Sequence, residues 1–316
     1  MYFCMDKKLI SFVIPAYSEE KNIALLYKEL ILNFEKISDT YKYEIIFVND
    51  GSPDNSWEEI NKLCKKNKNV VGINLSRNFG HQGALTAGYT KAKGESIISM
   101  DCDGQDPVFV AFQMIKKWEK GYEVIYARRK KRNDNFLKKY TAIAYYKLLS
   151  FISETEIPRN VGDFRLIDKK VLKEFLKLDE KDRYIRGMFA WIGFKTAFID
   201  FERPERVHGE TAYTWRKMIR LAMDGILNFS MFPLRIGFIF GIIMILFSLG
   251  FHFYMIYDSV INDVFYPLYK WLIVTIFGIM GLQFMFMWIM GEYIGRIYNE
   301  TRGRPNFIIS DIKNEK

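Results

Sequence analysis

The chain has 316 residues and a formal net charge of +9, from 46 Lys and Arg against 37 Asp and Glu. Hydrophobic residues make up 49% and charged residues 26%, proportions that are typical of a folded protein and exclude a largely disordered chain. The positive charge fits a phosphorylated substrate, anionic lipid or nucleic acid as a partner. The three cysteines lack metal-ligand spacing, and their odd number favours free thiols over a disulfide framework.

Strands and helices alternate in the first part of the sequence. Short apolar runs that end in polar loops predict strands over Leu9–Ile14, Tyr43–Val48, Val70–Leu75, Ile97–Ser99 and Glu123–Ala127. Helical stretches lie between them. This alternation predicts an α/β domain with a Rossmann-like, doubly wound, mostly parallel sheet whose loops gather on one edge.

Helix starts are predicted from capping residues. Ser18 is expected to cap the first helix. The second helix is expected to begin at Ser56, where Glu59 completes a capping box. Asp106 is expected to cap a later helix, because Pro107 follows it at the position that proline favours.

The most informative stretch follows the fourth expected strand, where three carboxylates occur within six residues. Asp101 and Asp103 repel each other unless a cation lies between them, and such oxygen ligands suit Mg²⁺ or Mn²⁺. A solvated turn is the alternative, since an Asp-x-Asp pair alone is a weak signal. His81 and His208 have no ligand spacing and are interpreted as ordinary loop residues.

Two nucleotide-binding patterns are missing from the sequence. The first loop lacks the Gly-x-Gly-x-x-Gly fingerprint, and no Gly-Lys-Ser/Thr P-loop occurs anywhere, which excludes a dinucleotide dehydrogenase and a P-loop NTPase. A metal held by Asp101 and Asp103 is then the expected clamp for a diphosphate.

The last third contains two long runs without charged residues. Ile236–Tyr257 and Trp271–Gly291 each match the roughly 20 residues that cross a bilayer, so we predict two transmembrane helices, with buried core helices as the alternative. Between the runs, Asp258–Tyr269 has two aspartates and no Lys or Arg, whereas Arg235 precedes the runs and Arg296 follows them. This asymmetry predicts that both termini are cytoplasmic.

An amphipathic interfacial helix is predicted before these runs, over residues 213–232. Ile219 and Ile226 have helical spacing, and Arg216 and Arg220 lie among the apolar positions, as in helices that lie at the headgroups. A helix packed on its own domain is the alternative. The dense basic run Arg128–Arg132 fits either a surface that faces anionic lipid or a solvated loop.

Several motifs in order resemble the inverting, family 2, GT-A glycosyltransferases. Ile14–Glu20, Val48–Asp54 and the Asp101–Asp103 segment carry the general resemblance. The chain is more closely similar to the membrane-anchored polyprenyl-phosphate glycosyltransferases, the group of dolichol-phosphate mannose synthase and the bactoprenol glucosyltransferases. The segments that carry this closer match are Arg77–Gln82, Val161–Leu166, Arg183–Gly187, Trp191–Phe194 and Ile294–Tyr298.

The resemblance implies roles for individual residues. Those implied for nucleotide binding are Pro15, Tyr17, Glu19, Asp50 and Asp101, those for holding Mg²⁺ or Mn²⁺ are Asp101, Asp103 and Gln105, and those for contacting phosphate are Arg129 and Arg206. Asp163 matches the family's proposed catalytic base. A phosphate monoester with a second pKa of about 6 is already largely ionised near neutrality, so Asp163 could instead orient the acceptor or stabilise the sugar. A buried carboxylate paired with Arg165 is the structural alternative.

The chain departs from the family pattern at three positions. Ala212 stands where a lysine is common, Gly104 where a leucine is common, and Ala127 where a glycine often precedes the arginine pair. The missing lysine removes one phosphate contact that the resemblance implies. Phosphate binding is then expected to depend more strongly on Arg129 and Arg206.

The predicted organisation is a cytoplasmic GT-A domain over residues 1–212, the interfacial region over 213–232, a two-span anchor over 233–292 and a cytoplasmic tail over 293–316. By resemblance, an integral membrane enzyme moves a sugar from a nucleotide sugar to polyprenyl (undecaprenyl or dolichyl) phosphate at the cytoplasmic face, with a bacterial cytoplasmic membrane favoured. UDP-glucose is the favoured donor, and GDP-mannose, UDP-GlcNAc and a UDP-aminoarabinose are alternatives.

Two other functions are alternatives to a single sugar transfer. A processive polysaccharide synthase is less expected, because the Gln-x-x-Arg-Trp element and additional spans are absent. A non-catalytic membrane scaffold is the alternative from another class. With a bilayer and phosphorylated substrates as the expected partners, no nucleic acid is expected. Two-span anchors often associate, so a homo-oligomer is left open.

Overall fold

The computed structural model describes residues 7–130, 158, 160–180, 183–202, 257, 260–261 and 267–315. The predicted interfacial helix, nearly all of the first predicted span, and Arg206 lie outside these described residues.

An eight-stranded sheet forms the centre of the domain, in the order β7-β5-β6-β4-β1-β2-β3-β8. Its strands are β1 (Lys8–Ala16), β2 (Tyr41–Asn49), β3 (Val70–Leu75), β4 (Ser96–Ser99), β5 (Val124–Arg129), β6 (Val161–Asp168), β7 (Thr196–Phe201) and β8 (Ile309–Lys313). The five strands predicted from the sequence are all present, with small differences at their ends.

Most neighbouring strands run parallel. Strands β4, β1, β2 and β3 are parallel to one another, and β5 is parallel to β7, whereas β6 is antiparallel to β4 and β5, and β8 is antiparallel to β3. The prediction of a mostly parallel α/β sheet is therefore confirmed. In this topology the carboxyl ends of β1, β2, β4 and β5 meet the beginning of β6 at one edge.

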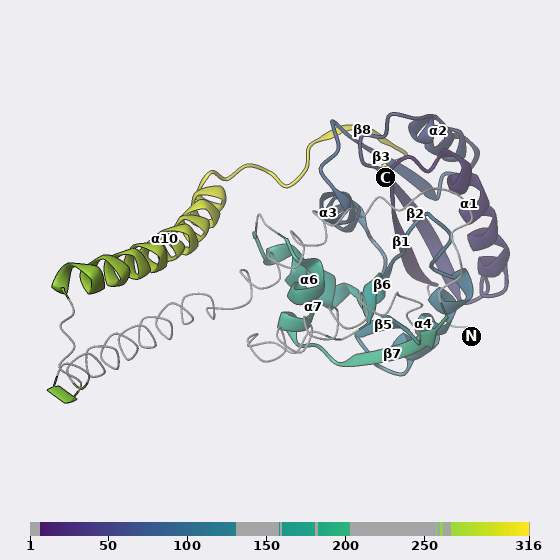
Figure 1. The fold of residues 1–316 in the computed structure, drawn as a ribbon. Coiled ribbons are helices and arrows are strands. Elements are labelled where there is room, and N and C mark those ends of the chain that lie inside the picture. Colours follow the sequence, from purple (N-terminus) through teal and green to yellow (C-terminus); the bar gives the residue numbers. More distant parts are fainter. Residues whose placement is uncertain are drawn as a thin grey trace.

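Helices cover both faces of the sheet (Figure 1). One core lies under α1 (Glu20–Glu35), α2 (Ser56–Lys66) and α4 (Val108–Glu119), and the other under α3 (His81–Lys91), α6 (Lys169–Lys177) and α7 (Ile185–Ile192). Along β1, Phe12 and Ile14 join the first core, whereas Val13 between them joins the second. Because both faces are buried, Phe12–Ala16 of this strand is a continuous apolar run rather than an alternating one.

The last helix, α10 (Leu268–Thr301), contains the whole second predicted span and projects away from the layered domain (Figure 1). Among the helices in the described ranges, none is both long enough and apolar enough to cross a membrane. The predicted transmembrane helices are therefore not confirmed.

The segment expected as a tail returns to the sheet as β8, which lies against the outer edge of β3 (Figure 1). Asn314 follows β8 with a left-handed φ of 58°. Its Nδ2 donates to the carbonyl oxygens of Cys64 at 2.6 Å, Asn67 at 3.3 Å and Val70 at 2.9 Å. This amide joins the end of the chain to the end of α2 and the start of β3.

Replacing Asn314 by alanine is expected to lower the free energy of unfolding by about 1–3 kcal/mol, because buried carbonyls lose their donor. Denaturant unfolding of the full chain in detergent measures the change. Asn314→Gly removes the same amide but keeps the left-handed backbone accessible. A glycine variant as stable as the wild type would contradict a role for the amide.

Candidate active site

The register between β4 and β6 brings two acidic segments together at the edge where the strands end. Ser99 pairs with Arg165, and Ser99 Oγ donates to the carbonyl oxygen of Asp163 at 2.6 Å. Asp101 lies two residues beyond Ser99, and Asp163 lies two residues before Arg165 on the antiparallel strand. The Asp-x-Asp loop and Asp163 are therefore neighbours, although they are far apart in the sequence.

Asp163 lies at the centre of a cluster of basic side chains. Its Oδ1 accepts from Arg165 Nη2 at 2.8 Å and from Arg186 Nε at 3.1 Å, and its Oδ2 accepts from Arg186 Nη2 at 2.8 Å. The Asp163 side chain is 7% exposed and that of Arg165 is fully buried. The ion pair with Arg165, which is the structural alternative, is thus present. Arg186 makes a second ion pair with Asp163 and donates to both of its carboxylate oxygens.

His81 is the third basic partner of Asp163. Its Nε2 lies 3.5 Å from Asp163 Oδ2 and 3.6 Å from Asp101 Oδ1. The interpretation of His81 as an ordinary loop residue is wrong, because it begins α3 and its ring lies between two carboxylates. Burial disfavours the charged ring, but the hydrogen bond to Asp163 and the charge of Asp101 outweigh it and raise the pKa of His81 to about 9.

The basic partners determine the ionisation of Asp163. Burial alone would raise the pKa of this carboxyl, but the charge of Arg186, the hydrogen bonds from His81 and Arg186 and the charge of Arg165 outweigh it and hold the pKa well below its usual range. A carboxylate with so low a pKa is a poor proton acceptor. Its chemistry is to hold Arg186 and His81 in place.

Arg165 belongs to the interior rather than to the open edge. Its guanidinium lies over the rings of Tyr126, at 5.6 Å, and Phe189, at 5.0 Å, and its Nη2 also donates to the carbonyl oxygen of Gly162 at 3.0 Å. Arg186 and His81, with side chains 21% and 32% exposed, are the partners of Asp163 that solvent can reach.

The two carboxylates of the Asp-x-Asp loop differ in exposure: the Asp101 side chain is 33% exposed, whereas Asp103 is buried. Cys102 between them is buried in the core under α4, and Asp103 Oδ1 accepts from the backbone N–H of Gln105 at 3.0 Å. Gly104 has a φ of 75°, a left-handed conformation that glycine adopts without strain, which fits its departure from the family's leucine.

Asp106 does not cap the helix that follows it. The cap of α4 is Pro107, and no side chain caps this helix. Asp106 Oδ2 instead accepts from the backbone N–H of Asp101 at 2.9 Å, and the Asp106 residue is 3% exposed. The prediction that Asp106 is an N-cap is wrong, because its carboxylate bonds to the backbone of the Asp-x-Asp loop rather than to the first turn of α4.

The donors present fit a hard divalent cation. In the described part of the chain, no three His, Cys, Asp or Glu side chains are grouped so that they could hold a metal ion by themselves. Mg²⁺ commonly needs only one or two protein carboxylates and completes its shell with water and substrate phosphate. Asp101 and Asp103, with the amide oxygen of Gln105, would supply such a donor set.

Asp50 supports the loop that precedes His81. Its two carboxylate oxygens accept from the backbone N–H groups of Phe79, at 2.7 Å, and Gly80, at 3.0 Å. Burial raises the pKa of this carboxyl, partly offset by these two hydrogen bonds. The nucleotide-binding role implied for Asp50 remains a prediction, and the structure adds that Asp50 fixes the start of α3.

Gly51 allows the same loop to approach closely. It has a φ of 62°, and a Cβ at this position would lie 2.4 Å from the carbonyl carbon of Arg77 and 2.6 Å from the backbone nitrogen of Asn78. No side chain fits there without moving the loop that leads to His81.

Gly51→Ala is expected to destabilise the fold by about 2–5 kcal/mol, the combined effect of a left-handed alanine and of overpacking against backbone. Denaturant unfolding measures it. Gly121→Ala is the matched control, because Gly121 has a φ of 82° and a Cβ added there would meet no atom within 4 Å, so only the cost of about 1–2 kcal/mol for the left-handed backbone applies. Equal losses in the two variants would contradict the close approach.

The first two loops are tied to each other. The backbone N–H of Ser18 donates to Ser52 Oγ at 3.1 Å, and that of Glu19 donates to Ser56 Oγ at 3.0 Å. Two predicted caps are therefore wrong: Glu19 rather than Ser18 precedes α1, and Ser56 caps no helix, since Asn55 precedes α2 without a side-chain cap. The start of α2 at Ser56 is confirmed.

The other residues implied for the site lie at the same edge where they are described. Pro15 is the penultimate residue of β1 and is buried, and Tyr17, just beyond the strand, is 46% exposed. Arg129 ends β5, and its Nη2 lies 3.3 Å from the position of a Cβ on Gly162, so the glycine leaves room for it. Arg206 is outside the described residues, and its phosphate contact stays a prediction.

Sequence reasoning missed the parts played by His81 and Arg186. Both lie in segments quoted for the resemblance, Arg77–Gln82 and Arg183–Gly187, so the signal was present without an assigned role. Only the fold brings both segments to Asp163.

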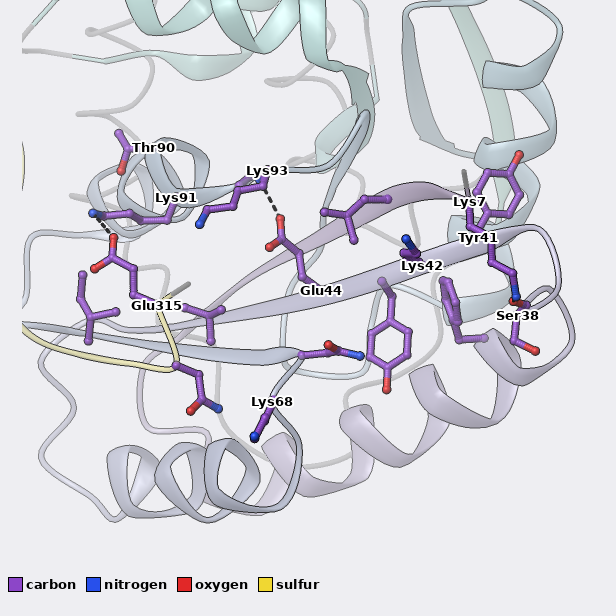
Figure 2. Close-up of a pocket in the computed structure, with 18 residues that line it drawn as sticks. Lys7, Ser38, Tyr41, Lys42, Glu44, Lys68, Thr90, Lys91, Lys93 and Glu315 are labelled. Carbon is purple, nitrogen blue, oxygen red and sulfur yellow. Dashed lines mark hydrogen bonds and ion pairs between the residues drawn. The ribbon is translucent and has the colours of Figure 1, made fainter. Parts of the chain in front are cut away.

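A separate groove of about 810 Å³ lies at the opposite end of the strands (Figure 2). Tyr41 and Lys42 at the start of β2 line it, together with an ion pair of 2.6 Å between Lys91 and Glu315. None of the residues predicted for the site lines this groove, so it is distinct from the candidate active site.

Comparison with known proteins gives the family. A family model described as glycosyl transferase family 2 matches residues 11–176. The chain belongs to this family. A prophage bactoprenol glucosyl transferase homolog of Escherichia coli strain K12 is 38% identical over 96% of this chain and 99% of its own length. The uncharacterized glycosyltransferase YkcC of Bacillus subtilis strain 168 is 41% identical over 95% of this chain and 92% of its own length.

Membership of glycosyl transferase family 2 confirms the resemblance seen in the sequence motifs. The family match and the sheet topology support a GT-A-like fold and a transferase. Among solved structures, the mannosyltransferase PcManGT from Pyrobaculum calidifontis in complex with GDP-Man and Mn²⁺ is 16% identical, with a TM-score of 0.43 over 64% of this chain and 59% of that chain.

Proposed function

We propose that this glycosyltransferase moves a sugar, with inversion at the anomeric carbon, from a nucleotide sugar to a polyprenyl phosphate. The observation that carries the proposal is the position of Asp163, with Arg186 and His81, beside the Asp-x-Asp loop at one sheet edge. Relatives named bactoprenol glucosyl transferase support the acceptor and favour glucose, with UDP-glucose as the donor.

The proposed reaction is a single displacement. An oxygen of the acceptor phosphate bonds to the anomeric carbon as the bond to the nucleoside diphosphate breaks, and the diphosphate leaves with the bonding electrons. Mg²⁺ or Mn²⁺, held by Asp101, Asp103 and Gln105, would neutralise charge on that leaving group. Arg129 and Arg206 would contact phosphate.

Asp163 serves this reaction by orientation rather than by proton transfer. Its low pKa makes it a weak base, and an acceptor phosphate with a second pKa of about 6 is already largely dianionic at neutral pH. Arg186, held by two hydrogen bonds to Asp163, presents positive charge at the edge where the phosphates meet. The family's label of catalytic base is therefore not needed.

The proposal predicts how the rate depends on pH. Because the folded-state pKa of Asp163 lies below its usual range, this carboxyl stays ionised between pH 5 and pH 8. It therefore adds no limb to the pH–rate profile in that range. We expect kcat/KM for the acceptor to fall below about pH 6 as the phosphate gains a proton. A phosphonate acceptor with a higher second pKa should move this limb upward, and a limb that does not move would assign it to the protein.

The proposal includes a membrane anchor. Ile236–Tyr257 and Trp271–Gly291 carry no charged residue, and large apolar side chains on α10, such as Leu272, Ile276 and Ile279, are at least half exposed. Such a surface suits lipid contact. With the interfacial segment 213–232, the anchor would hold the catalytic edge near the headgroups, on the cytoplasmic side of a bacterial membrane.

The test is transfer of radiolabel from a panel of nucleotide sugars to undecaprenyl phosphate by purified full-length protein in detergent. We expect label from one donor, UDP-glucose, in the lipid fraction as a product with one sugar. Product of many sugars would favour a processive synthase. Absence of transfer from every donor, in folded protein, would overturn the proposal and favour a scaffold.

A further inference from the structure

The segment between α10 and β8, residues 302–308, contacts α3, which begins with His81, and the loop that leads to Arg186 on α7. Asn306 Nδ2 donates to the carbonyl oxygen of Glu180 at 3.1 Å, in the loop that leads to α7. The carbonyl oxygen of Asn306 lies against the first turn of α3, 3.3 Å from the position of a Cβ on Gly83. One residue of this segment therefore touches the approach to Arg186 and the helix that begins with His81.

The carbonyl of Glu180 is a shared acceptor. Arg183 Nε donates to it at 3.1 Å, and Arg183 Nη2 donates to the carbonyl oxygen of Leu178 at 2.8 Å. Arg186 follows Arg183 by three residues. Asn306 and Arg183 thus donate to the same carbonyl oxygen, that of Glu180, which precedes Arg186 by six residues in the sequence.

A second link joins α7 to α3. The backbone N–H of Ile185 donates to Gln82 Oε1 at 3.3 Å. Because Gln82 follows His81 and Ile185 precedes Arg186, this bond links the positions of His81 and Arg186, two of the basic partners of Asp163. A shift of either helix start would change the distances of both side chains to the carboxylate.

The segment is itself fixed at its distal end. Phe307 and Ile309 pack against the core under α3, α6 and α7, and the backbone N–H of Ser76 donates to the carbonyl oxygen of Ile308 at 2.9 Å. The contact of Asn306 is therefore made by a fixed strap rather than by a loose tail.

We propose that residues 302–308 form a strap that positions the site, and that Asn306 is a positioning residue whose hydrogen bond to Glu180 keeps Arg186 and His81 on Asp163. This inference rests on the proposed function, because it assigns the strap an effect on sugar transfer. On this proposal, the chain after α10 helps to set the geometry of the catalytic site.

Three variants of the full-length protein test the strap. Asn306→Asp keeps the shape of the side chain but removes its donor, Asn306→Ala removes both, and Ser310→Ala is the matched control. Ser310 Oγ donates to the carbonyl oxygen of Asn74 at 3.0 Å, a similar bond from the same tail that is made to β3 rather than to the loop before α7. The readouts are kcat, KM for the nucleotide sugar, thermal unfolding and hydrogen exchange at the Ile185 amide.

We expect both Asn306 variants to lower kcat about three- to ten-fold, the loss of one hydrogen bond, with KM for the donor within about two-fold and the unfolding temperature close to that of Ser310→Ala. The Ile185 amide should exchange faster in the Asn306 variants than in the control. If the wild type transfers sugar and Asn306→Asp has the same kcat as Ser310→Ala, the strap proposal is overturned and the proposed function is not.

The exchange measurement separates this inference from the proposed function. If wild type transfers no sugar from any donor, the proposed function fails, and the positioning of α7 is still judged by the Ile185 amide. Unchanged exchange in both Asn306 variants would then overturn the strap as well. A joint fall of kcat and unfolding temperature in the Asn306 variants, without a faster Ile185 amide, would also overturn it, since that pattern is a general loss of stability.

Discussion

Replacing Asp163 by asparagine is expected to lower kcat for sugar transfer by at least about 100-fold, the scale of losing a charge that organises a site for the transition state. The amide retains the shape of the side chain but removes the negative charge that faces Arg165, Arg186 and His81. Removing one partner of a buried ion pair commonly costs about 3–5 kcal/mol, so the fold is also expected to weaken. Steady-state transfer and denaturant unfolding measure the two effects.

Two controls separate catalysis from folding. Asp200→Asn breaks the exposed ion pair between Asp200 and Arg128, whose atoms lie 2.6 Å apart, and is expected to change kcat less than two-fold. Asp163→Asn combined with Arg165→Met removes the buried charge that would be left unpaired, and should regain stability without regaining activity. Transfer by folded Asp163→Asn within threefold of the wild type would contradict the role of this carboxylate.

Removing the metal is expected to stop transfer, and Asp103→Asn should reproduce that loss. The asparagine keeps an oxygen that can accept from the N–H of Gln105, as Asp103 Oδ1 does at 3.0 Å, so the change isolates the charge. We expect kcat to fall by at least about 100-fold, because the diphosphate loses its neutralising cation. After EDTA treatment, Mn²⁺ should restore the wild type but not the variant.

Asp106→Asn is the matched control from the same loop. Asp106 accepts from the N–H of Asp101 at 2.9 Å, and an amide oxygen can keep that bond, so we expect a loss of less than about tenfold and full recovery with Mn²⁺. Wild-type transfer that persists in EDTA would contradict a metal clamp. Transfer by Asp103→Asn that Mn²⁺ restores would assign the ligation to other residues.

Local chemistry predicted the strands well and the helix caps poorly. The strand from Val70 to Leu75 was predicted with its observed bounds, because a short apolar run between turn residues has few other structures available. Ser56 was expected to cap its own helix but accepts from the N–H of Glu19 in another loop. Asp106 likewise binds the backbone of Asp101. In each case a partner from the fold replaced the local one.

The sequence by itself determined the alternating α/β order, the acidic loop after the fourth strand and the family, since each depends on residues that are close together in the chain. The tertiary structure decided what surrounds Asp163. His81 and Arg186 reach this carboxylate from two helices, through the register of β4 with β6 and the loop that Asp50 holds. Likewise, β8 pairs with β3 from the far end of the chain. Local patterns do not encode such contacts, because they form only when the sheet closes and distant segments share one edge.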